Sequence, residues 1–193
     1  MMPTSPDKID PRILRTQKLI IQAFHKLTLA KDFKDITVKD ITDEATINRA
    51  TFYAHFADKY ELMEESILRM ISERIGGELK RFEHLGKETV ADVFLLIVKF
   101  QSDYESRLTS QCKRSSQSFA YVFESAIKSE LEKLFRRLFQ SKDPGLSPSS
   151  VRIGAALLSS SLYGAMLDWK NEDLSAEQYI RYAIPYLSGE YFS

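Results

Sequence analysis

The sequence predicts an all-α protein built from two helical parts, and three observations support this prediction. Apolar residues recur at steps of three, four or seven along most of the chain, which is the spacing of one face of an α-helix. Helix-capping patterns precede several of these stretches. No segment alternates polar and apolar residues as a half-buried strand does, and no internal repeat or low-complexity tract interrupts the pattern.

The charge balance carries a weak signal about partners. The 193 residues include 27 Lys and Arg and 27 Asp and Glu, so the net charge is zero, and a neutral sum argues against a nucleic-acid partner. The distribution of charge matters more than its sum. Residues 1–60 hold ten basic and eight acidic side chains, so a slight basic excess falls in the first third of the chain.

Other sequence features favour a cytoplasmic protein. No run of 18 apolar residues occurs, so we expect no membrane span, and no apolar stretch of a secretory signal follows the first charges. Cys112 is the only cysteine and cannot form an internal disulfide, which suits a reducing compartment. The three histidines lie far apart, without the ligand spacing of a metal site. We expect no metal, no cofactor and no catalytic constellation.

The first third of the chain predicts a small helical domain. Residues 1–9 contain little that could be buried, so we expect a disordered lead-in. An amphipathic helix is predicted from Pro11 to about Lys31. After it, Thr37 and Asp40 form a capping box for a short helix, and Asn48 caps a second short helix that runs through His55. Two short helices joined by a tight turn are the geometry of a helix-turn-helix, which places its second helix in the major groove of DNA.

The polar residues of this motif suit contact with DNA. Asn48, Arg49, Ala50 and Thr51 place small or hydrogen-bonding side chains at the start of the second helix, where close approach to base edges is needed. Phe52 and Phe56 are four residues apart and are expected to face the core. The alternative is a small helical subdomain whose polar residues merely face solvent. The complete predicted set of DNA contacts is Thr37, Lys39, Asn48, Arg49, Ala50, Thr51, Tyr53, His55 and Lys59.

The order of these residues resembles the signature of the TetR/AcrR family of bacterial transcriptional regulators. The resemblance lies in the series Thr51-Phe52-Tyr53-x-His55-Phe56-x-x-Lys59-x-x-Leu62 and covers roughly residues 10–62. It implies a homodimer that binds a palindromic, double-stranded DNA operator, with a helical C-terminal domain that binds a small-molecule effector. Two positions depart from the family pattern, because Thr46 and Ala50 stand where glycine is usual.

The remaining two thirds predict a chain of longer helices. A connecting helix from Tyr60 is expected to end at Gly86, and another to begin at a capping box formed by Thr89 and Asp92. Helices are also expected over residues 115–140, 148–170 and 176–188. The segment SLYGAMLDWKNEDLSAEQY resembles the end of a subset of TetR-like regulators from Gram-positive bacteria that includes relatives of dihydroxyacetone kinase activators.

Two sets of residues in this region are candidates for binding. The last two helices carry many small residues that permit close packing, so we expect a dimer interface there, with intramolecular core as the alternative. The interface set is Leu158, Leu162, Trp169, Tyr179 and Ala183. An aromatic and aliphatic stripe is a candidate effector pocket, with ordinary core as the alternative; its members are Phe94, Ile97, Tyr104, Phe119, Phe123 and Tyr163.

The sequence thus predicts an N-terminal three-helix, helix-turn-helix DNA-binding domain over residues 10–60 and a helical ligand-binding and dimerisation domain over residues 61–193. The expected function is a DNA-binding transcriptional regulator, with a repressor favoured. Two alternatives stay open: an activator or co-activator of the same fold that acts through a protein partner, and an all-α interaction module or enzyme with an incidental helix-turn-helix.

Overall fold

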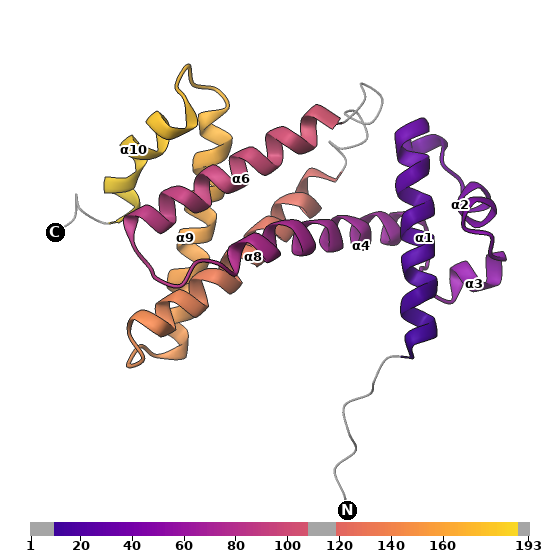
Figure 1. The fold of residues 1–193 in the computed structure, drawn as a ribbon, viewed down its shortest axis with the longest axis horizontal. Helices are drawn as coiled ribbons and strands as arrows, with labels where there is room; N and C mark the ends of the chain where they lie inside the picture. Colours follow the sequence, from indigo (N-terminus) through magenta and orange to yellow (C-terminus); the bar gives the residue numbers. More distant parts are fainter. Residues whose placement is uncertain (1–9, 108–118, 189–193) are drawn as a thin grey trace, which may run out of the picture. The chain divides into compact units, whose positions relative to one another are not determined.

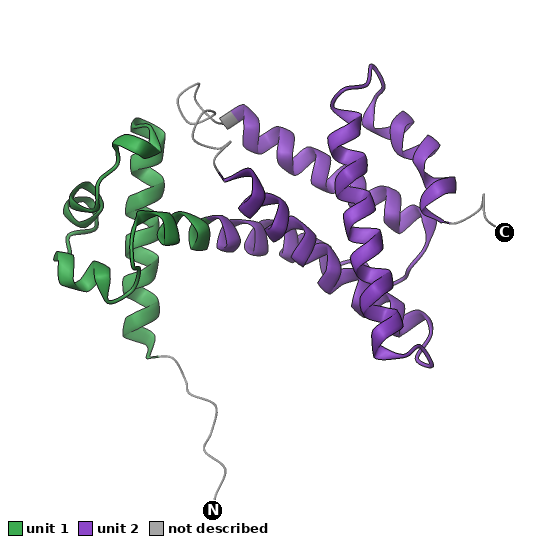
Figure 2. Cartoon of the chain, turned by 180° about the vertical axis from the view of Figure 1, so that it is seen from behind, with its two compact units in different colours: residues 1–66, 108–118 green, residues 67–107, 119–193 purple. Residues whose placement is uncertain are grey.

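The computed structural model describes residues 10–107 and 119–188, which are helical without a strand (Figure 1). The expected lead-in at residues 1–9 and Cys112 lie outside these ranges. Contacts between Cα atoms divide the chain into two compact units, coloured separately in Figure 2. Within the described ranges, unit 1 runs to Ser66 and unit 2 begins at Ile67. None of the described helices is both long and apolar enough to cross a membrane.

Unit 1 is a small domain of short helices packed on one longer helix. It contains α1 (Pro11–Ala30), a 3-10 turn η1 (Phe33–Asp35), α2 (Val38–Ala45), α3 (Arg49–Tyr53) and the first half of α4 (Lys59–Ile71). In Figure 1, α2 and α3 lie along one side of α1. The core is formed by side chains from each of these segments, including Ile20, Phe24, Ile36, Ile41, Phe52 and Leu62, which are almost completely buried.

The predicted capping box of unit 1 is confirmed, and two further caps accompany it. The side chain of Asp10 accepts a hydrogen bond from the backbone N–H of Arg12 at 2.9 Å, directly before Pro11. Both halves of the capping box between Thr37 and Asp40 are present. One carboxylate oxygen of Asp58 accepts from two backbone N–H groups at the start of α4, at 2.8 and 2.9 Å. Each cap satisfies backbone donors that the first turn of a helix leaves without partners.

Unit 2 is a bundle of longer helices. It continues α4 through a π-helical turn η2 (Ser72–Gly76) and α5 (Gly77–Leu79), followed by α6 (Lys87–Arg107), α8 (Ala120–Lys142), α9 (Pro148–Trp169) and α10 (Ala176–Leu187). Helices α8 and α9 share the most extensive contact, and α10 packs on α6 and α9. The side chains of Ser147 and Ser175 cap α9 and α10.

Two predicted boundaries in unit 2 are wrong. The connecting helix ends at Leu79 rather than at Gly86, after the π-helical turn. Helix α6 begins at Lys87, two residues before the predicted cap, and the hydroxyl of Thr89 donates to the carbonyl of His84 instead of capping the helix. Both differences arise from the connection over residues 80–86. The local hydrogen bonds of this connection cannot be predicted from the spacing of apolar residues.

Candidate functional site

The turn between α2 and α3 is closed by a residue in the left-handed conformation. Thr46 has φ 55° and ψ 48°, and it is the one non-glycine residue with positive φ among the described residues. The N–H of Thr46 donates to the carbonyl of Asp43, and the N–H of Ile47 donates to the carbonyl of Thr42, at 3.2 and 3.0 Å. These two bonds are those of a Schellman motif, which usually takes glycine at this position. Thr46 therefore closes the same kind of turn that glycine usually closes, but its backbone conformation is strained.

Helix α3 divides its side chains between the core and solvent. Phe52 is completely buried, whereas Arg49 and Ala50 are exposed and Tyr53 is 52% exposed. The side-chain oxygen of Asn48 accepts from the backbone N–H of Thr51 at 2.7 Å and from its hydroxyl at 2.9 Å. This cap fixes the start of the helix and leaves the amide N–H groups of Asn48 available for an external acceptor.

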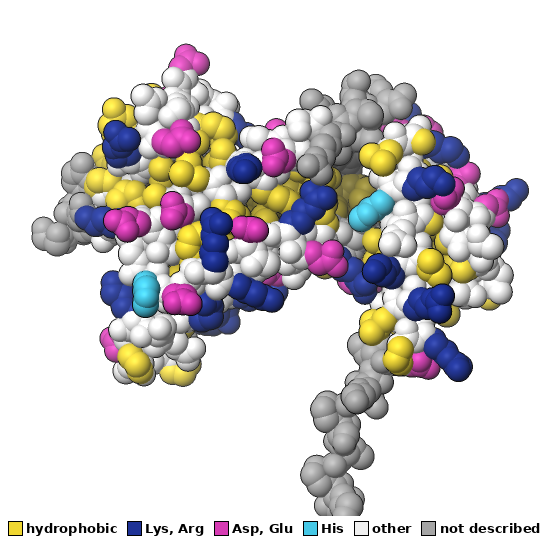
Figure 3. All heavy atoms as spheres, in the orientation of Figure 1, with side chains coloured by type: hydrophobic (Ala, Val, Ile, Leu, Met, Phe, Trp, Pro, Cys, Tyr) yellow, Lys and Arg dark blue, Asp and Glu magenta, His cyan; other side chains and the backbone are white. Residues whose placement is uncertain are grey.

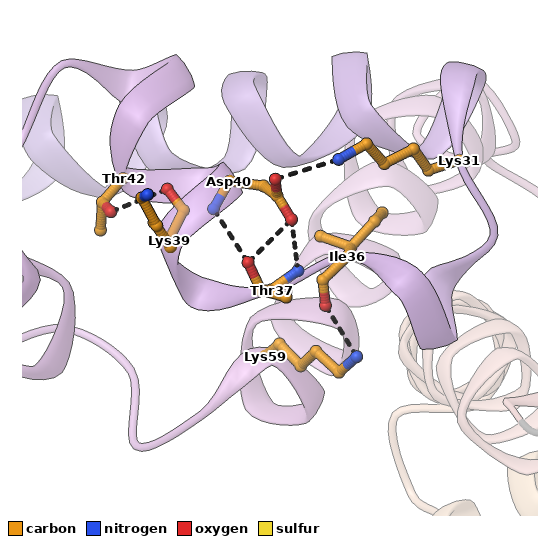
Figure 4. Close-up of polar contacts among 7 residues, drawn as sticks. All are labelled: Lys31, Ile36, Thr37, Lys39, Asp40, Thr42 and Lys59. Carbon is orange, nitrogen blue, oxygen red and sulfur yellow. Dashed lines mark hydrogen bonds and ion pairs between the residues drawn. The ribbon is translucent and has the colours of Figure 1, made fainter.

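The start of α2 is held by a network around Asp40 (Figure 4). The Asp40 carboxylate accepts from the backbone N–H and the hydroxyl of Thr37, both at 2.8 Å, and from the ammonium of Lys31 at 3.0 Å. The hydrogen bond from the Thr37 backbone, the bond from Lys31 and the Thr37 hydroxyl together lower the pKa of Asp40 to about 2. Lys39 lies on the exposed side of α2, and only its backbone carbonyl takes part, accepting from the hydroxyl of Thr42 at 3.0 Å.

Lys59 has an internal role that its position in the sequence did not suggest. Its ammonium donates to the backbone carbonyls of Phe33, Lys34 and Ile36, at 2.9, 3.0 and 2.8 Å, and lies 4.7 Å from the centre of the Phe33 ring. Figure 4 shows the bond to Ile36. All three ammonium donors are therefore occupied, and they tie the start of α4 to the η1 turn. A contact of Lys59 with DNA stays a prediction.

The predicted DNA contacts differ in how available they are. Thr37, Lys39, Asn48, Arg49, Ala50 and Tyr53 are exposed, whereas Thr51, His55 and Lys59 are half-buried. Within the described ranges, the side chains of Lys39, Arg49 and Tyr53 have no recorded hydrogen bond or ion pair, so their donors are free to meet an external acceptor. Figure 3 shows basic and acidic side chains interleaved over the face in view.

Comparison with known proteins identifies this region. The model of bacterial regulatory proteins of the tetR family matches residues 20–66. These residues have the sequence pattern of the TetR family. The matched segment contains α2, the strained turn and α3, together with most of α1 and the first half of α4.

A curated relative also matches part of this chain. An uncharacterised HTH-type transcriptional regulator from Bacillus subtilis (strain 168), YxbF, is 42% identical over 69 residues. The match covers 35% of this chain and 18% of that protein, so the shared part is a fraction of the relative's length.

Solved structures share the fold over nearly the whole length. The TetR transcriptional regulator from Streptococcus agalactiae 2603V matches with a TM-score of 0.51 and 20% identity, over 92% of this chain and 96% of that one. The dihydroxyacetone kinase operon activator DhaS matches with a TM-score of 0.50 and 19% identity over the same shares. The chain therefore has the fold of TetR-type regulators, with an N-terminal helix-turn-helix and a helical C-terminal part.

Three of the six predicted pocket residues, Phe94, Tyr104 and Phe123, make aromatic contacts in unit 2. Tyr104 and Phe123 meet at 5.1 Å between ring centres, with Phe100, which the sequence prediction missed, 5.9 Å from Phe123. Phe94 stacks on Tyr179 at 5.8 Å. Phe94 and Ile97 are completely buried, and Phe119 and Tyr163 almost so. Burial, followed by the charge of Glu124, raises the pKa of Tyr163 to about 12.

Two cavities in unit 2 have linings that include none of the six predicted pocket residues. The larger, about 660 Å³, lies between the η2–α5 segment and α6, and its lining carries both charge signs: Glu73, Arg74, Ile75, Gly77, Glu78, Arg81, Asp92, Leu95, Leu96, Lys99, Phe100 and Asp103. The smaller, about 390 Å³, lies among the start of α6 and the ends of α8 and α10: Leu85, Gly86, Lys87, Val90, Phe139, Lys142, Leu158, Ile184, Leu187 and Ser188. A role for the six predicted residues in effector binding stays a prediction.

The predicted dimer residues make contacts within one chain. Leu162 is completely buried, and Leu158 lines the smaller cavity. The indole N–H of Trp169 donates to the carbonyl of Leu174 at 2.9 Å. The hydroxyl of Tyr179 donates to Asp168 at 2.7 Å, and Ala183 is half-buried. A different face of α9 and α10 is exposed and apolar, formed by Ile153, Leu157, Leu167, Tyr182 and Tyr186.

Proposed function

We propose that this protein is a dimeric transcriptional regulator that binds DNA through α3. The observation that carries the proposal is the division of α3, in which Phe52 anchors the helix completely inside unit 1 while Arg49, Ala50 and Tyr53 face outward. A helix held from behind, with a free guanidinium and a small residue at its exposed start, suits insertion into the major groove.

Each outward residue has a distinct proposed role. Arg49 has five N–H donors in a rigid fork and suits the O6 and N7 acceptors of a guanine. Ala50 lets the helix backbone approach the bases, and the Tyr53 hydroxyl reaches a phosphate. Lys39 on α2 and the amide of Asn48 add donors beside them. Thr37, Thr51, His55 and Lys59 complete the proposed surface, with Thr51 and Lys59 acting chiefly through the internal bonds that position α3 and α4.

We propose that the exposed apolar face of α9 and α10, formed by Ile153, Leu157, Leu167, Tyr182 and Tyr186, is where a second copy binds. Leu157 and Tyr182 are 64% and 66% exposed, which leaves large apolar side chains in water. Ser160 and Gly164 lie between Leu157 and Leu167 on the exposed side of α9, and small residues allow two helices to approach closely. Pairing this face with its own copy gives a symmetric contact of four helices. The two α3 helices then meet half-sites of a palindromic operator about one DNA turn, roughly 34 Å, apart.

We propose that a small-molecule effector controls this binding. An effector that binds better to one arrangement of unit 2 shifts the population toward it and thereby changes operator affinity. Repression relieved by the effector is the sign of control that we favour. An activator acting through a protein partner is the second candidate, favoured by the likeness in fold to an operon activator.

Binding to the protein's own promoter region tests the proposal. The wild-type chain should bind this duplex with an affinity that falls steeply as salt rises, and Arg49→Ala should weaken binding by about 1–3 kcal/mol. Arg136→Ala is the matched control, because this arginine lies on α8 in an exposed ion pair with Glu132 and should leave binding unchanged. No complex at low salt, or equal binding by Arg49→Ala, would leave an interaction module or an enzyme as the better account.

A further inference from the structure

We propose that the smaller cavity of unit 2 binds a small amphiphilic monoanion, a carboxylate carrying an unbranched apolar chain. The cavity measures about 390 Å³ and is enclosed by segments of α6, α8, α9 and α10. Its volume lies in the range of roughly 300–1,000 Å³ typical of small-molecule sites. The site is independent of α3, so it holds whether or not unit 1 binds DNA.

The walls of the cavity are mostly apolar and favour an apolar ligand. Leu85, Phe139, Leu158, Ile184 and Leu187 supply most of the lining, and all five are only half-buried. Their apolar surface therefore meets water inside a concave site, and a hydrocarbon chain that displaces this water gains free energy in proportion to the area it covers. Gly154 allows the Phe139 ring to pack closely against α9, because a Cβ atom at this position would lie 3.3 Å from the ring.

The rim of the cavity carries basic side chains and favours a ligand with a negatively charged headgroup. The lining contains two lysines, Lys87 and Lys142, and neither aspartate nor glutamate. In the described part of the chain, no ion pair or side-chain hydrogen bond is recorded for Lys142, which is exposed at the last residue of α8.

The dipoles of the helices that end at the cavity do not make its rim negative. The ends of α8 and α10 at the cavity each contribute about half a negative charge, and the start of α6 contributes about half a positive charge. The full positive charge of Lys142 alone outweighs the difference, so the rim remains positive.

The larger cavity of unit 2 provides an internal comparison. Its lining holds three basic and four acidic side chains, and Arg81 is paired with Glu78 at 3.2 Å. Charges of both signs offer no preference for a single anionic headgroup. A ligand with one carboxylate and an apolar chain should therefore choose the smaller cavity.

Titration with sodium decanoate below its micelle concentration, followed by calorimetry, tests the proposal. We expect saturable binding of one decanoate per chain, with affinity rising from hexanoate to decanoate by up to about fourfold per methylene. Decanol and decyltrimethylammonium, which share the chain but lack the negative charge, should bind more weakly.

Paired variants locate the site. Leu158→Trp fills the smaller cavity and should abolish binding, whereas Leu95→Trp, in the larger cavity, should leave it unchanged. Lys142→Met should weaken decanoate about three- to fivefold, and Lys133→Met, on the same helix but paired with Glu130, should not. The Lys142 variant keeps the test decisive if Leu158→Trp fails to fold.

Four results of these titrations would overturn the proposal. These are no saturable binding of decanoate, loss of binding in Leu95→Trp with retention in Leu158→Trp, equal binding of decyltrimethylammonium, and unchanged affinity in Lys142→Met. Binding that appears only after removal of residues 189–193 would also overturn the proposal, because those residues would then occupy the cavity in the wild-type chain.

Discussion

The strained turn between α2 and α3 predicts that Thr46→Gly stabilises unit 1. Thr46 holds a left-handed conformation at φ 55° and ψ 48°, which costs an L-residue roughly 1–2 kcal/mol. Glycine removes this cost, but it also gives the unfolded chain more freedom, which costs about 0.5–1 kcal/mol. The expected net gain is about 0.5–1 kcal/mol. The side chain of Thr46 is exposed, so no buried contact is lost.

Amide hydrogen exchange across α2 and α3 measures this gain where it arises. Exchange that proceeds through opening of the turn should slow about two- to fivefold in Thr46→Gly, which corresponds to the same free energy through RT at 25 °C. Thr46→Ala is the matched control: it removes the hydroxyl and the branch but keeps the Cβ, so it should recover little of the strain. Faster exchange in Thr46→Gly, or equal slowing in both variants, would refute the assignment of strain to the turn.

Three further substitutions test the hydrogen bonds of Lys59, the capping network of Asp40 and the proposed dimer face at Leu157. Lys59→Met removes three hydrogen bonds to carbonyls and should lower the free energy of unfolding by about 1–3 kcal/mol, whereas Lys39→Met should change it little; equal thermal midpoints would contradict this. Asp40 has its pKa lowered from 3.8 to about 2 in the folded chain, so its contribution to stability is complete above pH 4 and is lost as the pH falls toward 2. Wild-type protein should therefore lose more stability than Asp40→Asn over this interval in urea unfolding, and parallel curves would argue against the capping network. Leu157→Asp should shift the protein to monomers in sedimentation at micromolar concentration, whereas Leu146→Asp, exposed before α9, should not; an unchanged dimer would exclude the proposed face.

Much of unit 1 could be predicted because its signals are local. A cap such as Asn48 acts on the backbone N–H three residues ahead, and Phe52 and Phe56 share a helix face, so short stretches of sequence carry the information. Burial of both phenylalanines and the capping box at Thr37 follow directly from these patterns.

The connection after α4 could not be predicted because contacts distant in sequence shape it. At Gly76 a side chain would lie 2.6 Å from the Glu130 carboxylate of α8, and the π-helical turn ends there. The sequence shows two adjacent glycines but not the helix that approaches them. The same reason hides the role of Lys59, whose three carbonyl partners lie more than 20 residues earlier.

The buried and exposed faces of α9 are hard to distinguish in the sequence because apolar and small residues surround this helix. Leu157 and Leu158 are neighbours in sequence, yet one is exposed and the other lines a cavity. Periodicity alone does not distinguish the side of α9 that packs on α8 from the side that is exposed to solvent. The tertiary contacts of α8 and α10 make that distinction.

The salt dependence of binding to the promoter duplex is the decisive measurement for the proposed role of α3 in DNA binding. We expect the logarithm of the association constant to fall linearly with the logarithm of salt concentration. We also expect Arg49→Ala to lose affinity selectively for the preferred sequence, while Arg136→Ala retains it. If the chain forms no complex at low salt, or if its binding is indifferent to Arg49, then α3 does not bind DNA in the way proposed.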